Sequence, residues 1–136
     1  MEHSLVLIKP DGVAKKICGE IISRYERKGL TISAMKLINV SRDLAAAHYA
    51  EHKDKPFFED LIAFITSGPV VAMVLSGTNA VAAIRQLNGA TDPLKAEVGS
   101  IRGDFGLAIN ENVVHASDAV STAEREVALW FPEFKN

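Results

Sequence analysis

The chain lacks the features of a disulfide-stapled or membrane-spanning protein. Its single cysteine, Cys18, cannot form an internal disulfide, and this favours a reducing compartment. No apolar run approaches the ~20 residues that cross a bilayer, and no basic segment followed by a long apolar run resembles a secretion signal. We therefore expect a cytoplasmic protein with no membrane partner.

An excess of charge of one sign is also missing. The 15 lysines and arginines nearly balance the 17 aspartates and glutamates, and the formal net charge is −2 at pH 7. A nucleic-acid partner held by bulk positive charge is therefore not indicated. We expect one domain over residues 1–136, a length that can bury roughly two thirds of the surface of the unfolded chain.

Several common cofactor and metal motifs are absent. There is no G-x-x-x-x-G-K-[ST] phosphate loop and no G-x-G-x-x-G dinucleotide fingerprint. Cys18 has no cysteine or histidine partner at the spacing of a zinc site. His48 and His52 are spaced as i and i+4, but Tyr49 stands where a metalloprotease motif requires glutamate. Any chemistry must come from other residues.

The apolar patterning predicts short strands that alternate with helices. We expect strands within residues 5–8, 30–40, 70–75 and 113–116, and helices within 13–25, 45–50, 57–65, 79–87 and 121–130. Gly29 is expected to end the first helix, and Ser121 and Glu124 form a capping box for the last one. This order predicts an α+β fold, a ferredoxin-like antiparallel sheet with helices packed on it.

A long segment that starts at Gly89 and ends at Asn112 resists this assignment. It has only a brief helical possibility at residues 93–97, yet it contains Thr91 and Arg102. Loops longer than ~12–15 residues in a compact domain are usually functional or disordered. Because the segment is not poor in apolar residues, we expect an ordered functional loop.

The segment 112–118, Asn-Val-Val-His-Ala-Ser-Asp, is the most informative part of the chain. It ends a short apolar run with His115, and Ser117 and Asp118 follow. Neutral imidazole is a competent nucleophile near pH 7, because its ordinary pKa is about 6.5. His115 is therefore a candidate for covalent catalysis without a cofactor. A lone histidine is more often a structural hydrogen-bonding residue, so the pattern by itself leaves both roles open.

Segments across nearly the whole chain together resemble the nucleoside diphosphate kinase family. They are residues 7–13, 48–52, 56–58, 89–91, 101–105, 112–118 and 123–126, followed by Trp130 and Phe131. The resemblance implies a ping-pong reaction. His115 takes the γ-phosphoryl group of a nucleoside triphosphate, forms a phosphohistidine, and passes the group to a nucleoside diphosphate.

The resemblance also implies a role for each site residue. The implied catalytic residues are His115, Glu126, which hydrogen-bonds the imidazole, Ser117, which steadies Glu126, Tyr49 and Lys9. The implied nucleotide-binding residues are Lys9, His52, Phe57, Leu61, Arg85, Thr91, Arg102, Ile109 and Asn112. Arg85, Thr91 and Arg102 would hold the phosphates, His52 would lie at the phosphate end, and Lys9 and Asn112 would bind near the sugar.

Base and sugar tolerance should be broad. Phe57 would stack on one face of the base and Ile109 would cover the other, and every base has such faces.

Each residue has a plainer alternative, since Phe57 could be a core aromatic, Arg85 a surface ion-pair residue and Glu126 an ordinary helix carboxylate. Two other functions stay open: a non-catalytic ferredoxin-like nucleotide-binding module, and a histidine phosphocarrier between proteins.

The substrate implies Mg²⁺ more than the sequence does. Mg²⁺ usually binds through substrate phosphates with one or two carboxylates, and no dedicated carboxylate cage is evident. We expect no direct protein ligand, and Asp118 at most touches the ion through water.

The resemblance further implies a homo-oligomer, with a hexamer favoured over a tetramer. Val98 stands where proline is common in the family, so the loop needs external support.

Overall fold

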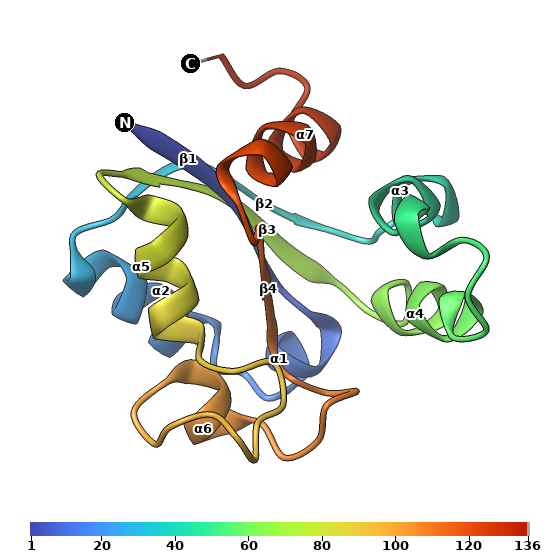
Figure 1. Ribbon diagram of the computed structural model, residues 1–136, viewed down its shortest axis with the longest axis horizontal. Helices are drawn as coiled ribbons and strands as arrows, with labels where there is room; N and C mark the ends of the chain where they lie inside the picture. Colours follow the sequence, from blue (N-terminus) through green and yellow to red (C-terminus); the bar gives the residue numbers. More distant parts are fainter. Residues whose placement is uncertain (136) are drawn as a thin grey trace.

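The centre of the protein is a four-stranded antiparallel sheet. A computed structural model describes residues 1–135, and its strands are β1 (Glu2–Ile8), β2 (Thr31–Ile38), β3 (Val70–Gly77) and β4 (Val114–Ala116). They lie in the order β2-β3-β1-β4, and every neighbouring pair is antiparallel (Figure 1). This order and the helices on the sheet confirm the predicted ferredoxin-like α+β fold.

Helices cover both faces of the sheet. They are α1 (Pro10–Ala14), α2 (Cys18–Lys28), α3 (Arg42–His48), the 3-10 helix η1 (Ala50–His52), α4 (Phe58–Ile65), α5 (Ala80–Asn88), α6 (Ile101–Phe105) and α7 (Val120–Trp130). One core cluster joins Val6 and Ile8 to α2 and α5, and the other joins Leu5 and Leu7 to α3, α4 and α7. Successive residues of β1 thus enter opposite layers, which explains its uninterrupted apolar sequence.

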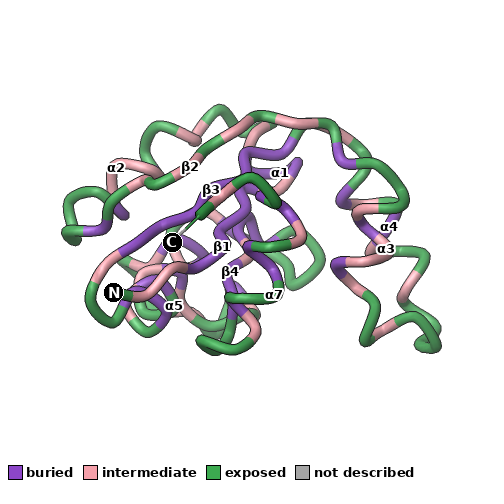
Figure 2. The backbone as a smooth tube through the Cα atoms, turned by 90° about the horizontal axis from the view of Figure 1, so that it is seen from above, coloured by how far each residue is buried: buried purple, intermediate pink, exposed green. Residues whose placement is uncertain are grey.

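The helices α3 and α4 form an arm at one side of the sheet. Both views place this arm away from α2 and α5, and exposed residues lie along its outer part (Figures 1 and 2). Ser41 begins the arm because its Oγ accepts a hydrogen bond from the backbone N–H of Leu44 at 3.1 Å, a helix N-cap. None of the helices in residues 1–135 has both the length and the apolar character needed to cross a membrane.

The continuous helix predicted for residues 13–25 is wrong. The structure has two helices, α1 and α2, separated at Lys16, whose φ of 61° is left-handed. Val13 and Ile17 nevertheless pack against the same core cluster as Ile21. Apolar spacing reports which residues face the core, so it did not reveal a break that keeps them on the same side. Gly29 ends α2 with a φ of 108°, as predicted.

Two further local predictions are wrong. Helix α7 begins at Val120 with Ala119 as N-cap and without a side-chain cap, so Ser121 lies inside the first turn and forms no capping box. In the segment from Gly89 to Asn112, residues 93–97 are not helical, with a turn at residues 93–95, and the helix is α6. Ser100 caps α6 by accepting the N–H of Gly103 at 3.0 Å. A glycine inside so short a helix lowers its intrinsic propensity and hides it from sequence reading.

We predict that Gly103→Ala destabilises the protein by roughly 1–3 kcal/mol, the usual cost of overpacking. A Cβ at this position would overlap the backbone carbonyl of Glu97, and backbone cannot give way as a side chain can. Urea unfolding measures the change. Gly19→Ala is the matched control, because a Cβ there meets nothing within 4 Å and alanine favours a helix by roughly 0.5–1 kcal/mol. Equal stabilities of the two variants would contradict the prediction.

Candidate active site

The backbone before His115 is held in a rare conformation. Val113 has a φ of 75°, which is unfavourable for a β-branched residue. Its N–H donates to Asp11 Oδ2 at 2.9 Å, and its carbonyl accepts from the Lys9 N–H at 2.9 Å. Gly12 permits this approach, because a Cβ there would lie 3.1 Å from the Val113 carbonyl and 2.8 Å from the Ile8 side chain. The start of α1 therefore determines how β4 presents His115.

His115 is joined to a buried carboxylate. Its Nε2 lies 3.1 Å from Oε1 of Glu126, and Ser117 Oγ donates to the same oxygen at 2.7 Å. Ser117 is tied to β1 in turn, since its Oγ accepts the Leu5 N–H at 3.2 Å. The side chain of His115 is 27% exposed and that of Glu126 is 7% exposed. The nucleophile candidate thus reaches solvent while its partner does not.

The charge of Glu126 determines which nitrogen of His115 is free. Burial alone would raise the pKa of Glu126, but the hydrogen bonds from His115 and Ser117 outweigh it and hold the pKa below its ordinary value. An ionised carboxylate only accepts hydrogen bonds, so Nε2 of His115 carries the proton. The lone pair of the neutral imidazole therefore lies on Nδ1.

A cluster of aromatic side chains packs beside His115. The ring of His48 lies 4.7 Å from that of His115, centroid to centroid, and 4.8 Å from that of Tyr49. The Trp130 indole N–H donates to His48 Nδ1 at 3.0 Å. Burial, followed by the nearby His115, lowers the pKa of His48 to about 3, and burial raises the pKa of Tyr49 to about 12. Both side chains are therefore neutral near pH 7.

Lys9, Asn112 and Thr91 form a second polar group. Lys9 Nζ donates to Asn112 Oδ1 at 2.7 Å, and Asn112 Nδ2 donates to the Thr91 carbonyl at 3.1 Å. Burial, opposed by the charge of Asp11 and assisted by that of Arg102, lowers the pKa of Lys9 to about 8. The structure thus brings together three of the residues predicted from sequence, with Lys9 at the end of β1 and the other two at the ends of the long loop.

Arg102 braces the long loop. Its guanidinium donates to the carbonyls of Gly89 at 2.9 Å, Asn112 at 3.3 Å and Val114 at 2.7 Å. The side chain is buried, and burial lowers its pKa to about 10, so it remains charged near pH 7. The sequence predicted a phosphate ligand at this position but did not predict the brace. Arg85, predicted for the same phosphates, is exposed on α5.

The residues predicted to grip a base present apolar surface to solvent. Phe57 is 43% exposed and Ile109 is 56% exposed, whereas Leu61 is partly buried. The ring of His52 lies 5.5 Å from the ring of Phe57, and Nδ1 of His52 is buried without a hydrogen-bond partner in the described part of the chain. Phe57 is thus not the core aromatic of the plainer alternative.

One group of side chains has the composition of a metal site. One ligand atom each of His48, His115 and Glu126 lie within 4.8 Å of one another. However, the Trp130 N–H already occupies the lone pair on Nδ1 of His48, and the Nε2 of a neutral His48 then carries a proton. The group cannot offer three lone pairs as it stands, and its nitrogen-rich donor set does not suit Mg²⁺. Asp118 is exposed.

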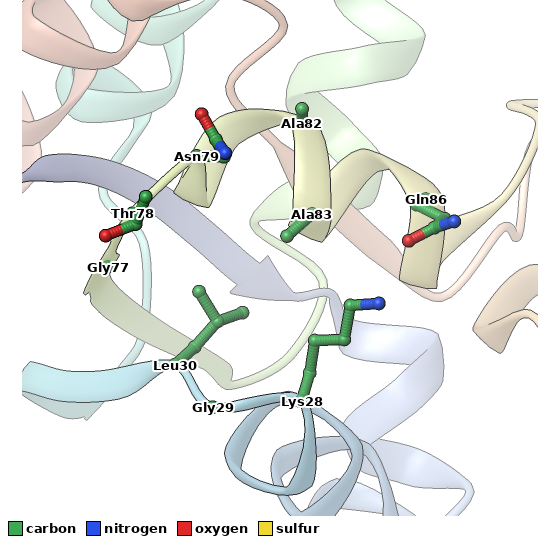
Figure 3. Close-up of a pocket in the computed structure, with 9 residues that line it drawn as sticks. All are labelled: Lys28, Gly29, Leu30, Gly77, Thr78, Asn79, Ala82, Ala83 and Gln86. Atoms are coloured by element: carbon green, nitrogen blue, oxygen red, sulfur yellow. The ribbon is translucent and has the colours of Figure 1, made fainter.

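Two surface hollows lie away from His115. The larger, about 700 Å³, lies between the end of α2, the end of β3 and α5, and Lys28, Thr78, Asn79 and Gln86 are among its lining residues (Figure 3). The smaller, about 310 Å³, is lined by Asp11, Phe64, Ser67 and Glu111 among others. His115 lines neither hollow. Its hydrogen bonds and partial exposure, and not cavity size, identify the candidate site.

The comparisons with known proteins agree with one another. The family model described as nucleoside diphosphate kinase matches residues 2–135. A curated relative from Mycobacterium avium (strain 104), named nucleoside diphosphate kinase, is 62% identical over 133 residues, which cover 97% of this chain and 98% of that protein. A relative of the same name from Nocardia farcinica is 63% identical over 134 residues, covering 98% and 96%.

Solved structures also match the fold of this chain. A halophilic nucleoside diphosphate kinase from Halobacterium salinarum in complex with CDP matches with a TM-score of 0.93 and 48% identity, over 96% of this chain and 87% of that one. A nucleoside diphosphate kinase family protein from Babesia bovis matches with a TM-score of 0.95 and 47% identity, over 100% and 95%.

We predict that burial of Lys9 makes stability pH-dependent at alkaline pH. Its folded-state pKa of about 8 lies below the ordinary 10.5, so the unfolded chain binds more protons between these values. The free energy of unfolding should therefore rise with pH across this window in the wild type, and less so in Lys9→Met. Urea titrations at pH 8 and pH 10 measure the slopes. Lys28→Met, at an exposed lysine, is the control and should follow the wild type. An unchanged slope in Lys9→Met would refute the argument.

Proposed function

The chain belongs to the nucleoside diphosphate kinase family, and from this premise we propose how its own residues carry out the reaction. It is a phosphotransferase that moves a phosphoryl group between nucleotides. The observation that carries the residue-level proposal is the hydrogen-bonded series Ser117–Glu126–His115, which leaves Nδ1 of His115 free. The two other candidate functions, a non-catalytic module and a phosphocarrier between proteins, are not favoured.

Nδ1 of His115 attacks the γ-phosphorus of a nucleoside triphosphate. The N–P bond forms as the bond from phosphorus to the β–γ bridging oxygen breaks, and the nucleoside diphosphate leaves with that electron pair. A second diphosphate then attacks with its terminal oxygen and takes the group from His115. The Nε2 proton stays in place, and Glu126 stabilises the positive charge that develops on the imidazole, as the third member of other nucleophilic triads does.

The charged and polar groups around His115 hold the phosphates and the sugar. Arg85, which is exposed, and Thr91 bind the diphosphate. Arg102 contributes its positive charge and those guanidinium N–H groups that do not donate to the carbonyls of Gly89, Asn112 and Val114. Lys9 and Asn112, already hydrogen-bonded to each other, bind near the sugar hydroxyl and the transferred phosphate. Tyr49 lines the site, and His52 lies at its phosphate end.

Phe57 and Ile109 grip the base by its faces, with Leu61 behind. Stacking is tolerant of base identity, since every base has a π-face. Purine and pyrimidine nucleotides, with ribose or deoxyribose, are therefore accepted. The Halobacterium salinarum relative was solved with CDP, which supports a pyrimidine at the equivalent place in this chain.

Nucleoside diphosphate kinases generally use a divalent cation, and we propose Mg²⁺ for this one. The described residues offer no oxygen cage near His115, and the exposed Asp118 suits contact through a water molecule. The substrate phosphates would therefore carry the ion. When bound, it supplies neutralisation of charge on the phosphate oxygens.

Exposed apolar side chains support a homo-oligomer. Leu94, Val98 and Leu107 on the long loop are 78%, 91% and 79% exposed, and Met35 and Leu37 on the edge strand β2 are 53% and 65% exposed. Contact with a neighbouring subunit would offset the entropy of ordering the loop. A hexamer is favoured over a tetramer. The lone Cys18 favours a reducing compartment and so supports a cytoplasmic location.

We predict an acid-labile, base-stable phosphohistidine at His115. Incubation with γ-labelled ATP and unlabelled diphosphates of several bases should label His115 and then the diphosphates. His115→Ala should abolish both steps. Glu126→Gln should slow transfer by about tenfold or more with little change in diphosphate affinity, because the lost interaction acts in the transition state.

Glu124→Gln on the same helix is the control for this assay, because Glu124 is exposed and should leave transfer unchanged. Full labelling of His115→Ala would overturn the covalent mechanism. Strict preference for one base would overturn the reading of the Phe57 and Ile109 contacts.

We predict that the protein in solution is a hexamer. Light scattering on a sizing column should give six times the 14.7 kDa mass of the chain. A species of four chains would correct the stoichiometry alone. A fully active monomer would refute the argument that the loop needs a neighbour.

A further inference from the structure

His48 lies beside the nucleophile, yet the steps above assign it no role. It is the last residue of α3 and is 5% exposed. Its ring meets those of Tyr49, His115 and Trp130 at interplanar angles of 74°, 79° and 88°, all edge-to-face. A residue of α3 thus contacts both β4, which carries the nucleophile, and α7, which carries Glu126.

Trp130 determines the orientation and protonation of the His48 ring. An indole N–H can only donate, so Nδ1 of His48 must hold a lone pair and Nε2 must carry the proton. Protonation of His48 would set two N–H groups against each other at 3.0 Å. Charges from His115 on β4, Arg125 on α7 and His52 in η1 also oppose it, and only Glu126 favours it. His48 is therefore a neutral ring with a fixed orientation.

The hydrogen bond from His115 to Glu126 does not by itself orient the nucleophile. It restrains the imidazole at Nε2, which lies close to the Cβ–Cγ axis, so the ring can still turn about the Cβ–Cγ bond with little change in this hydrogen bond. In-line attack requires the Nδ1 lone pair to point at phosphorus. A second contact on the ring is needed to fix its plane, and the His48 ring at 4.7 Å supplies one.

The polar pair is hard to explain as packing alone. Trp130 is 1% exposed and His48 is 5% exposed, so each buried polar group would be unsatisfied without the other. Two apolar side chains of similar size would fill the same space without this dependence. The hydrogen bond does what apolar packing does not, since it sets the angle at which the His48 ring meets His115.

We propose that His48, oriented by Trp130, is a positioning residue that fixes the plane of the His115 imidazole for phosphoryl transfer. The proposal rests on the proposed function, because it takes His115 as the nucleophile. It assigns the C-terminal end of α3 to the catalytic apparatus, through His115 and without contact to the nucleotide.

The test compares two double variants that differ only at position 48, where one has an aromatic ring and the other does not. Both remove the polar pair, so neither leaves a buried donor unsatisfied. His48→Phe/Trp130→Phe keeps a planar ring against His115, whereas His48→Leu/Trp130→Phe keeps apolar volume without a ring. Single-turnover labelling by γ-labelled ATP measures the phosphorylation rate, and diphosphate titration measures affinity. We expect the Leu-containing variant to phosphorylate roughly 10–100-fold more slowly than the wild type, with the Phe-containing variant between the two because it keeps a ring but lacks the hydrogen bond that orients it, and diphosphate Kd values within about twofold.

A double-mutant cycle with Glu126→Gln separates positioning from general destabilisation. Both double variants are also made with Glu126→Gln. Because residue 48 and Glu126 act on the same imidazole, the rate ratio between the Phe-containing and Leu-containing variants should be clearly smaller with Glu126→Gln than without it. Two variants with equal phosphorylation rates, or a fully multiplicative cycle, would overturn the proposal. Wild-type label found on a residue other than His115 would instead refute the proposed function, so the two failures are distinguishable.

Discussion

The candidate active site depends on one buried negative charge, that of Glu126. A carboxylate on the core-facing side of α7 is stable only because Ser117 and His115 both hydrogen-bond it, and Ser117 is itself held by the backbone of β1. Trp130, one turn further along α7, packs in the same core layer as Leu5 and Leu7 of β1. The packing of α7 on the sheet and the orientation of the nucleophile therefore use the same helix, and neither can change without the other.

The fold was predictable where local pattern and tertiary packing agree. The uniform apolar run of β1, the glycine that ends α2 and the alternation in β2 all report a residue's own surroundings. The secondary-structure predictions are wrong where two different backbone conformations are compatible with the same apolar spacing. The break at Lys16 leaves Val13, Ile17 and Ile21 on the same core. Helix α6 is capped by Ser100 and needs the close backbone approach that Gly103 permits, and apolar spacing records neither.

The site was predictable to the level of residue type but not of contact. Family resemblance named His115, Glu126, Ser117, Lys9 and Asn112, and these side chains do meet in two hydrogen-bonded groups. It did not reveal that Arg102 donates to the backbone carbonyls of Gly89, Asn112 and Val114, because backbone acceptors leave no signature in sequence. Nor did it reveal the contact of His48 with Trp130, since no spacing rule links residues 82 positions apart.

The left-handed Val113 also determines which edge of the sheet can associate with another chain. β4 is an edge strand of three residues, and the left-handed Val113 just before it donates its own N–H to Asp11. Short, kinked edges do not template intermolecular pairing. β2, at the other edge, runs for eight residues. The sheet is therefore asymmetric: the β2 edge suits strand addition from another chain, and the edge that carries His115 does not.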